Sequence, residues 1–117
     1  MPEHETINYI ELPVKNMEAS KLFFSKTFGW TFTDYGPDYS SFQNAGIDGG
    51  FFRASLNVSA AKGSALIVLY SHTLEKTLTK VESSGGVILQ DIFSFPGGRR
   101  FHFSDPSENE FAVWSDK

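Results

Sequence analysis

The sequence predicts an α+β domain made of two tandem copies of one βαβββ module. Residues 7–34 can be laid over residues 64–91 with a constant offset of 57 positions and no gap. In each copy a short alternating segment precedes a helical pattern, and three more short alternating segments follow it. We therefore expect module one at residues 6–56, a connector at 57–63 and module two at 64–116.

Five identical residues support this repeat. Chance alone gives about one or two identities in an overlay of this length, so coincidence between two unrelated βα units remains the alternative. The predicted strands and helices also coincide in the overlay, which favours a true repeat. The identical pairs are Ile10/Ile67, Leu12/Leu69, Glu18/Glu75, Gly29/Gly86 and Asp34/Asp91.

The first copy opens with a strand at residues 7–14, along which apolar and polar side chains alternate. Asn16 can cap a helix at residues 17–28, and Gly29 ends that helix. Short alternating segments bounded by turn residues then predict three further strands. These strands are expected at residues 30–35, 39–44 and 49–56.

The second copy repeats this order, with a strand at residues 66–70 and Thr73 as the expected helix cap. The apolar stripe of the helix recurs at i, i+4 and i+7 as Leu74, Leu78 and Val81, and a pair of glycines ends the helix. The spacing of apolar residues in this strand and helix matches that in the first copy. The remaining strands are expected at residues 87–93, 100–104 and 110–115.

Length, composition and charge narrow the classes of function. A chain of 117 residues with 40% apolar residues and 12 phenylalanines can build one core and line an apolar pocket. The net charge of -4, without a basic run, argues against a nucleic-acid partner. The absence of cysteine excludes thiolate chemistry and favours a reducing compartment, and no apolar stretch is long enough to cross a membrane. We expect a cytoplasmic protein with a small-molecule ligand and no membrane partner.

Two motifs stand at opposite ends of the chain. The first is YIELPVKN at residues 9–16, followed by FF at 23–24 and FGW at 28–30. The second, DPSENEFAVW at residues 105–114, is similar to the ending Asp-Pro-x-Gly-Asn-x-x-x-x-Trp, with Glu108 where a glycine is usual. Together these motifs resemble the vicinal oxygen chelate superfamily (glyoxalase, bleomycin resistance protein, extradiol dioxygenase), and within it the lactoylglutathione-lyase-related branch.

The resemblance implies that the two modules lie side by side and form a cup-shaped mixed sheet with the helices outside and the ligand inside. Because side chains alternate along a strand, the cup-facing residues can be separated from the helix-facing ones. The residues expected to face the helices are Ile10, Leu12, Ile67, Leu69, Phe111 and Val113. Those expected to face the cup are Tyr9, Glu11, Leu66, Val68, Tyr70, Glu110, Ala112 and Trp114.

The metal enzymes of the superfamily hold one divalent ion through His, Gln or Glu on equivalent strands of the modules. At those positions the resemblance places Tyr9, Leu66 and Ala112, and the remaining position falls within residues 49–53, which include no Asp, Glu or His. Leucine and alanine cannot coordinate a metal. We therefore expect no metal and no other cofactor, and neither glyoxalase I activity nor extradiol ring cleavage by the metal route.

Glu11 and Glu110 are the candidate catalytic residues. Both carboxyl groups are expected on the inner face of neighbouring strands, beside three aromatic side chains of the cup. Burial beside such rings raises the pKa of a carboxyl group and suits it to general acid or base catalysis. In the alternatives, both acids lie at the solvated rim or pair with arginines, or they form an unusual metal site together with His102.

The turn at residues 96–98 leads Arg99 and Arg100 into a strand, where a guanidinium group can bind an anionic ligand. In the alternative, the turn only joins two strands and its arginines are solvated. His102 shares a strand face with Arg100 and Ser104, and the sequence shows no partner for it. The expected ligand-binding residues are Tyr9, Leu66, Val68, Tyr70, Arg100, His102, Ala112 and Trp114.

Two functions of different class follow from these residues. The first is a metal-free small-molecule binder with an aromatic-lined cup, as the resemblance to the bleomycin resistance branch implies. The second is a lyase-like or isomerase-like enzyme that acts on a small carbonyl compound through Glu11 or Glu110, with Tyr9 or Tyr70 assisting. An interaction protein is a third possibility. The resemblance also implies a homodimer, because exposed edge strands of such modules often pair.

Overall fold

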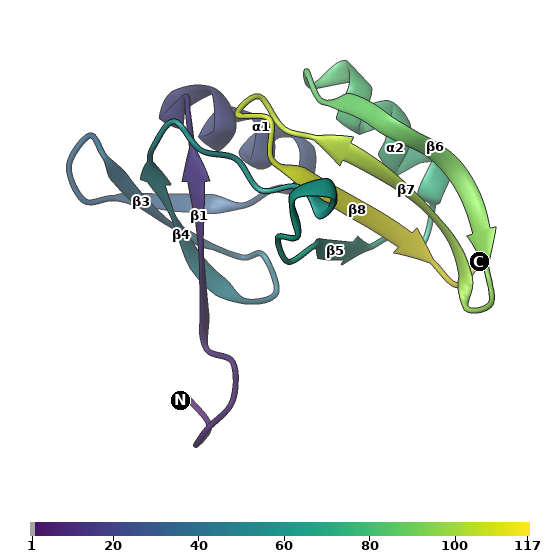
Figure 1. Cartoon of the computed structure of the whole chain (residues 1–117), viewed down its shortest axis with the longest axis horizontal. Coiled ribbons are helices and arrows are strands. Elements are labelled where there is room, and N and C mark those ends of the chain that lie inside the picture. Colours follow the sequence, from purple (N-terminus) through teal and green to yellow (C-terminus); the bar gives the residue numbers. More distant parts are fainter. Residues whose placement is uncertain (1) are drawn as a thin grey trace.

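The computed structural model describes residues 2–117 and contains two four-stranded mixed sheets and two α-helices (Figure 1). The first module consists of β1 (Tyr9–Val14), α1 (Met17–Phe28), β2 (Thr31–Asp34), β3 (Tyr39–Gln43) and β4 (Asp48–Arg53). The second consists of β5 (Ile67–Tyr70), α2 (Leu74–Ser83), β6 (Val87–Phe95), β7 (Gly98–Ser104) and β8 (Glu110–Ser115). The predicted fold class, two tandem βαβββ modules, is therefore confirmed. The connector adds a short 3-10 helix, Ala60–Lys62, that the sequence pattern did not predict.

The two sheets share one topology, with the strand orders β1-β4-β3-β2 and β5-β8-β7-β6. In each sheet the first strand runs parallel to the last, and the other pairs are antiparallel. Glu11 lies opposite Gly50 in the first sheet, and Val68 lies opposite Ala112 in the second. Gly50 and Ala112 are thus equivalent positions, and the repeat is present in the strand pairing as well as in the sequence.

Helix α1 begins and ends where the sequence predicts. The side chain of Asn16 accepts a hydrogen bond of 3.1 Å from the backbone N–H of Ala19, and Gly29 ends the helix with a φ of 74°. Thr73 precedes α2, but its side chain makes no capping hydrogen bond. Instead, the hydroxyl of Ser71 accepts from the backbone N–H of Thr73 at 2.9 Å. A serine two residues earlier therefore stabilises the start of this helix.

Helix α1 packs against both sheets and joins their cores. The ring of Phe24, which is fully buried, lies 5.7 Å from that of Phe51 in the first sheet and 5.1 Å from that of Phe111 in the second. Burial of one such side chain contributes about 1.5 to 3 kcal/mol. The expected helix-facing residues agree with this core. Leu12, Phe111 and Val113 are buried in it, and Ile10, Ile67 and Leu69 pack against it.

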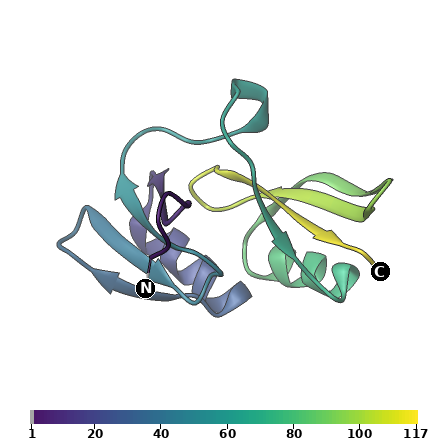
Figure 2. The ribbon, with the colours of Figure 1, turned by 90° about the horizontal axis from the view of Figure 1, so that it is seen from below.

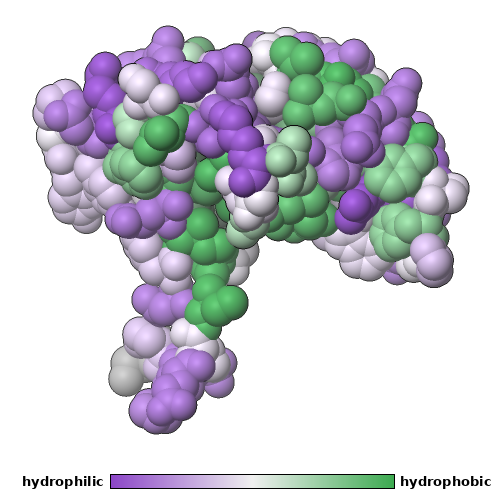
Figure 3. All heavy atoms as spheres, in the orientation of Figure 1, coloured by the Kyte–Doolittle hydropathy of each residue, from purple (hydrophilic) through white to green (hydrophobic). Residues whose placement is uncertain are grey.

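The helices cover one side of the molecule and leave the other side free. Both helices lie behind the sheets in Figure 1 and below them in Figure 2. We call the two helix-free sheet surfaces the open faces. The connector crosses between the modules on this side (Figure 2), and exposed apolar residues continue along the region between the modules (Figure 3). Among residues 2–117, no helix is long and apolar enough to cross a membrane.

The loop between β7 and β8 ties the second module to the first through Asn109, which is fully buried. Its side-chain amide donates a hydrogen bond of 2.6 Å to the carbonyl oxygen of Pro13 in β1. Its side-chain oxygen accepts a bond of 2.8 Å from the backbone N–H of Val58 in the connector. One side chain therefore satisfies backbone groups of two separate segments and ties both to the β7–β8 loop.

Asp105, in the same loop, is also buried. One carboxylate oxygen accepts from the hydroxyl of Ser20 in α1 at 3.0 Å, and the other accepts from the backbone N–H groups of Ser107 and Asn109. Burial raises the pKa of Asp105 above its usual value, although these hydrogen bonds act in the opposite direction. The closing motif of the sequence is therefore a joint between the modules.

Glu108 adopts a left-handed backbone conformation with a φ of 68°. Glycine adopts this conformation without steric cost, which explains why glycine is usual at this position in the motif. Glu108 forms an ion pair with the side chain of Lys15 at the end of β1. The one departure from the motif thus retains the backbone geometry and adds a further contact between the modules.

Replacing Asn109 with alanine should destabilise the fold strongly. Asn109→Ala leaves the Pro13 carbonyl and the Val58 N–H without their partners, and we expect a loss of about 2 to 4 kcal/mol of unfolding free energy in urea titrations. The matched control is Asn57→Ala, because the Asn57 amide donates to the Glu108 carbonyl at an exposed site. The control should lose less than about 1 kcal/mol. Equal losses of unfolding free energy in the two variants would contradict the role of Asn109 in holding the two modules together.

Candidate functional site

The open face of the first module carries a chain of hydrogen bonds that ends at Glu11. The hydroxyl oxygens of Tyr9 and Tyr39 are 2.6 Å apart, and Tyr39 donates to the Glu11 carboxylate at 2.8 Å. Because the proton of Tyr39 is used on Glu11, Tyr9 donates to the oxygen of Tyr39. Burial and these two hydrogen bonds raise the pKa of Tyr39, so its hydroxyl stays protonated at neutral pH.

Gly50 provides the space for this chain. A Cβ atom at position 50 would lie 2.0 Å from the hydroxyl oxygen of Tyr39 and 2.9 Å from that of Tyr9. The sequence interpretation did not include Tyr39 in the site. The signal that could have found it is the glycine inside strand β4, because a glycine there often marks the close approach of another group.

His102, which is buried, and Glu110, which is partly buried, form a pair on the open face of the second module. His102 is 4% exposed, and its Nδ1 lies 2.8 Å from one carboxylate oxygen of Glu110. The other oxygen accepts from the backbone N–H of Ala60 at 2.9 Å. His102, for which the sequence showed no partner, therefore has one.

The expectation that burial raises the pKa of Glu110 is wrong. Burial does act in that direction, but the hydrogen bonds from the Ala60 N–H and from His102 together outweigh it. The pKa of Glu110 consequently lies below its usual value, and the carboxylate is ionised at neutral pH. Glu110 therefore lacks the proton that a general acid needs.

Glu11 and Glu110 do not lie on neighbouring strands, which corrects another expectation. They belong to different sheets, because β1 pairs with β4 whereas β8 lies between β5 and β7. Neither acid pairs with an arginine, since Arg53 and Arg99 form ion pairs with other carboxylates. Within the part of the chain that the structure describes, no three His, Cys, Asp or Glu side chains are grouped to hold a metal ion. The alternative ligand set with His102 is therefore not assembled.

The positions at which the resemblance places metal ligands do not fit a metal ion. The hydroxyl of Tyr9 is engaged with Tyr39, and Leu66 and Ala112 have no donor atom in their side chains. The fourth position falls in β4, where the strand pairing makes Gly50 the equivalent of Ala112. These side chains together offer at most one phenolic oxygen, which is too few for a divalent ion.

Two aromatic side chains flank Arg100 on the open face of the second module, and two more continue from them across the sheet. The guanidinium carbon lies 5.3 Å from the ring centre of Phe93 and 5.7 Å from that of Phe95. The ring of Trp114 lies 6.3 Å from Phe95 and 5.2 Å from Tyr70. We call Tyr70, Trp114, Phe95 and Phe93 the aromatic row. None of the ion pairs found in residues 2–117 includes Arg100.

Phe93 and Phe95 were not among the predicted site residues. Val87 lies opposite Ser104 and Phe93 lies opposite Arg100, so both share the open face. The two shifts in the pairing, between Ile88 and Gln90 and between Gln90 and Phe93, cancel each other in the alternation. The signal that could have found Phe93 and Phe95 is therefore strict alternation from Val87 along the whole of β6.

The predicted ligand-binding residues are distributed over both modules. Tyr9 lies on the open face of the first module, and Leu66 directly precedes β5. Val68, Tyr70, Arg100, His102, Ala112 and Trp114 follow the alternation of the open face of the second module. The structure thus brings the second group together and separates it from Tyr9.

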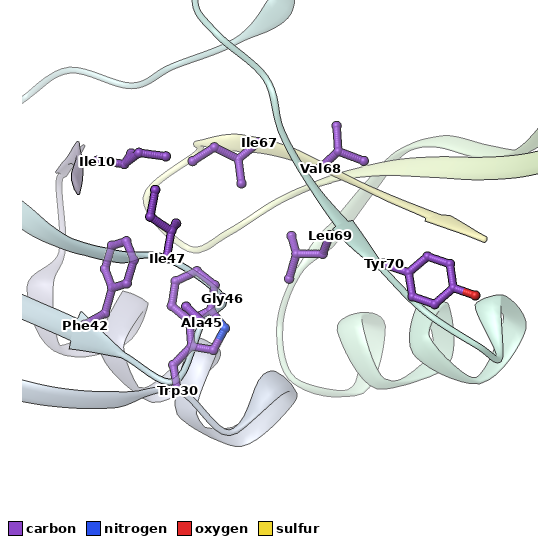
Figure 4. Close-up of a pocket in the computed structure, with 10 residues that line it drawn as sticks. All are labelled: Ile10, Trp30, Phe42, Ala45, Gly46, Ile47, Ile67, Val68, Leu69 and Tyr70. Carbon is purple, nitrogen blue, oxygen red and sulfur yellow. The ribbon is translucent and has the colours of Figure 1, made fainter. Parts of the chain in front are cut away.

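A cavity of about 400 Å³ lies between the two modules (Figure 4). Its walls are mainly apolar and include Ile10, Trp30, Phe42, Ile47, Ile67 and Leu69. Of the predicted ligand-binding residues, only Val68 and Tyr70 line it, and Figure 4 shows both side chains pointing away from the central isoleucines. This cavity depends on how the modules pack, so patterns within one strand could not have predicted it.

Comparison with known proteins agrees with this architecture. The sequence model described as the Glyoxalase/Bleomycin resistance protein/Dioxygenase superfamily matches residues 6–113. No curated protein matches the chain. A glyoxalase-related enzyme from Fulvimarina pelagi is similar in structure, with a TM-score of 0.78, 17% identity, and coverage of 95% of this chain and 88% of that one.

Two further similar structures are named for roles connected with antibiotics. A fosfomycin resistance protein from Listeria monocytogenes has a TM-score of 0.79 at 14% identity, with 97% of this chain and 94% of that one covered. An antibiotic binding protein from Streptomyces sp. CB03234 has a TM-score of 0.69 at 17% identity, with 98% of both chains covered. At these identities the likeness shows a shared fold.

The chain of hydrogen bonds over Gly50 can be tested by a double-mutant cycle. Gly50→Ala forces the Tyr39 side chain away, and Tyr39→Phe removes the same hydrogen bonds directly. We expect each change to cost about 1 to 2 kcal/mol of unfolding free energy. The double variant should cost clearly less than the sum, because both changes act on one interaction. Additive losses in urea titrations would show that Gly50 serves another purpose.

Proposed function

The chain belongs to the Glyoxalase/Bleomycin resistance protein/Dioxygenase superfamily, and on that basis we propose that it binds a small aromatic molecule without a metal ion. The binding surface is the aromatic row on the open face of the second module. The observation that carries the proposal is the row itself, in which four rings and the guanidinium of Arg100 form one continuous surface. The finer assignment to the lactoylglutathione-lyase-related branch stays a prediction.

The rings of the aromatic row are positioned to hold a flat ligand. Tyr70 is 43% exposed, while Phe93, Phe95 and Trp114 are partly exposed, so each ring has a free part to stack against. Aromatic pairs contribute about 0.5 to 1.5 kcal/mol beyond the area that they bury. Arg100, which has no ion-pair partner within residues 2–117, can direct a polar or anionic group of the ligand. This combination of apolar rings and few polar groups is typical of small-molecule sites.

The side chains at the implied metal positions support binding without a metal ion. Gly50, Leu66 and Ala112 supply no donor atom, and Tyr9 is already hydrogen-bonded. The antibiotic binding protein from Streptomyces carries, by its name, the kind of role that we propose here. Its likeness supports the proposal only through the shared fold.

An enzyme acting on a small carbonyl compound remains the second candidate. The observation in its favour is the series of hydrogen bonds from Tyr9 through Tyr39 to Glu11. Glu11 is exposed, so its carboxylate can take a proton from a ligand. Glu110 is less suited to this role, since both of its carboxylate oxygens are occupied. Glu11→Gln should abolish turnover if the chain is an enzyme, whereas a binder should retain its ligand.

We also propose that two copies form a homodimer. Strands β1 and β5 each pair on one side only, so each leaves a free edge. Large apolar side chains are exposed along these edges, with Ile7 at 82%, Val68 at 43% and Tyr9 at 41%. A twofold arrangement would cover them. Sedimentation of the purified chain should give twice the mass of 13.1 kDa, and a single-copy mass would refute the dimer.

The binding surface can be tested by thermal-shift screening of aromatic metabolites and antibiotics with the metal chelator EDTA present. At a ligand concentration of about 100 Kd the stabilisation should reach about 2.7 kcal/mol. Trp114→Ala should remove this shift, whereas Tyr35→Ala, which truncates an exposed ring of the first module, should retain it. Shifts that need an added divalent metal, or that persist in Trp114→Ala, would contradict the proposal.

A further inference from the structure

We infer that the unpaired nitrogens of His102 and Arg100 bind the hydroxyl group of an aromatic ligand, so that phenols are the ligand class of the second open face. This inference rests on the proposed function and names the chemical group that the site recognises. It follows from two buried nitrogen atoms, Nε2 of His102 and Nε of Arg100, that have no hydrogen-bond partner.

The bond to Glu110 fixes which nitrogen of His102 carries a proton. The carboxylate of Glu110 is ionised, so it only accepts hydrogen bonds. Nδ1 of His102 must therefore donate to it across the 2.8 Å contact. In the neutral ring, Nε2 is then left with a lone pair and becomes an acceptor.

Arg100 offers the complementary group. Its Nε always carries a hydrogen, because the guanidinium stays protonated in proteins. Arg100 and His102 point to the same side of β7, since they are two residues apart in a strand. Both contact the ring of Phe93, which stacks on His102 at 5.9 Å and lies 5.3 Å from the guanidinium carbon. One acceptor and one donor thus lie against the same ring.

A hydroxyl group satisfies this pair best. It donates its proton to Nε2 of His102 and accepts the N–H of Arg100 through its oxygen. A carboxylate only accepts hydrogen bonds, so it would leave the lone pair on Nε2 of His102 without a donor. A buried polar group without a partner costs about 1 to 3 kcal/mol, so a ligand that satisfies both nitrogens recovers this free energy on binding.

The rings beside the two nitrogens select an aromatic hydroxyl. Phe93 and Phe95 flank Arg100, and Trp114 lies beside Phe95, so a ring attached to the hydroxyl has aromatic neighbours. Phe93 lies in the edge strand β6, next to a shift in the pairing with β7. Phe93 is only partly buried, and a ligand that reaches Nε2 of His102 has to displace its ring from the stack on His102.

The inference can be tested with 2-naphthol and 2-methoxynaphthalene, two probes that differ only in the methyl group that replaces the hydroxyl hydrogen. Isothermal titration of the full chain should give 2-naphthol an affinity about tenfold higher, because the methoxy group cannot donate to His102. Trp114→Ala should weaken the binding of both probes and leave the ratio of their affinities unchanged. Arg100→Lys retains the positive charge but removes the Nε donor. This change should lower the affinity for 2-naphthol more than the affinity for 2-methoxynaphthalene.

Glu110→Gln gives a readout that a purely structural role would not change. The glutamine amide can donate to Nδ1 of His102, which moves the ring proton to Nε2 and turns that atom into a donor. The preference for 2-naphthol should then disappear or reverse. Near-UV circular dichroism checks that each variant is folded, and Arg100→Lys serves as the second test if Glu110→Gln unfolds.

The outcomes separate this inference from the proposed function. Equal affinities of the two probes for the unchanged chain, both lost in Trp114→Ala, would overturn the hydroxyl site and leave the aromatic binding surface standing. A tenfold preference that persists in both Glu110→Gln and Arg100→Lys would also overturn it. If neither probe binds at about 1 mM while other aromatic compounds do, the phenol class is wrong. If no aromatic compound binds at all, the proposed function fails as well.

Discussion

The burial of Phe24 between the two sheets is the interaction on which the rest of the structure depends. Its ring stacks on Trp30 at 4.4 Å within the first module and also contacts Phe111 in the second. Helix α1 can satisfy both contacts only if both sheets turn the same side towards the helices. The opposite surfaces of both sheets are therefore left without a helix (Figure 2). Tyr39 and Glu11 meet on one of these surfaces, and His102 and Glu110 meet on the other.

Much of the fold could be predicted from the sequence because local chemistry determines it. The cap at Asn16, the left-handed Gly29 and the period of two along each strand act over a few residues. The side of the sheet on which Arg100 and His102 lie could be predicted for the same reason. The length of β6 could not, because its two pairing shifts depend on how this edge strand follows β7.

The sequence predicts on which sheet face each site residue lies better than it predicts the hydrogen-bond partner of that residue. His102 meets Glu110 across two strands joined by a loop, and the register of those strands depends on hydrogen bonds within the loop. Tyr39 reaches Glu11 because Gly50 has no side chain between them. The hydrogen bonds from the Ala60 N–H and from His102 outweigh burial and lower the pKa of Glu110, so the expectation of a raised pKa failed once these partners were known. The same duplication has thus produced one open face rich in hydroxyl groups and another rich in rings.

The joint at residues 105–109 also affects how the chain folds during synthesis. Asn109 and Asp105 bind groups of the first module that precede them by about ninety positions, through Pro13 and Ser20. The first module therefore emerges from the ribosome before the segment that completes its packing. Until then, the inner surface of α1 has no second sheet to cover it, and the nascent chain exposes phenylalanine side chains to the cell. Exposed apolar surface of this kind makes the early stage of synthesis prone to aggregation.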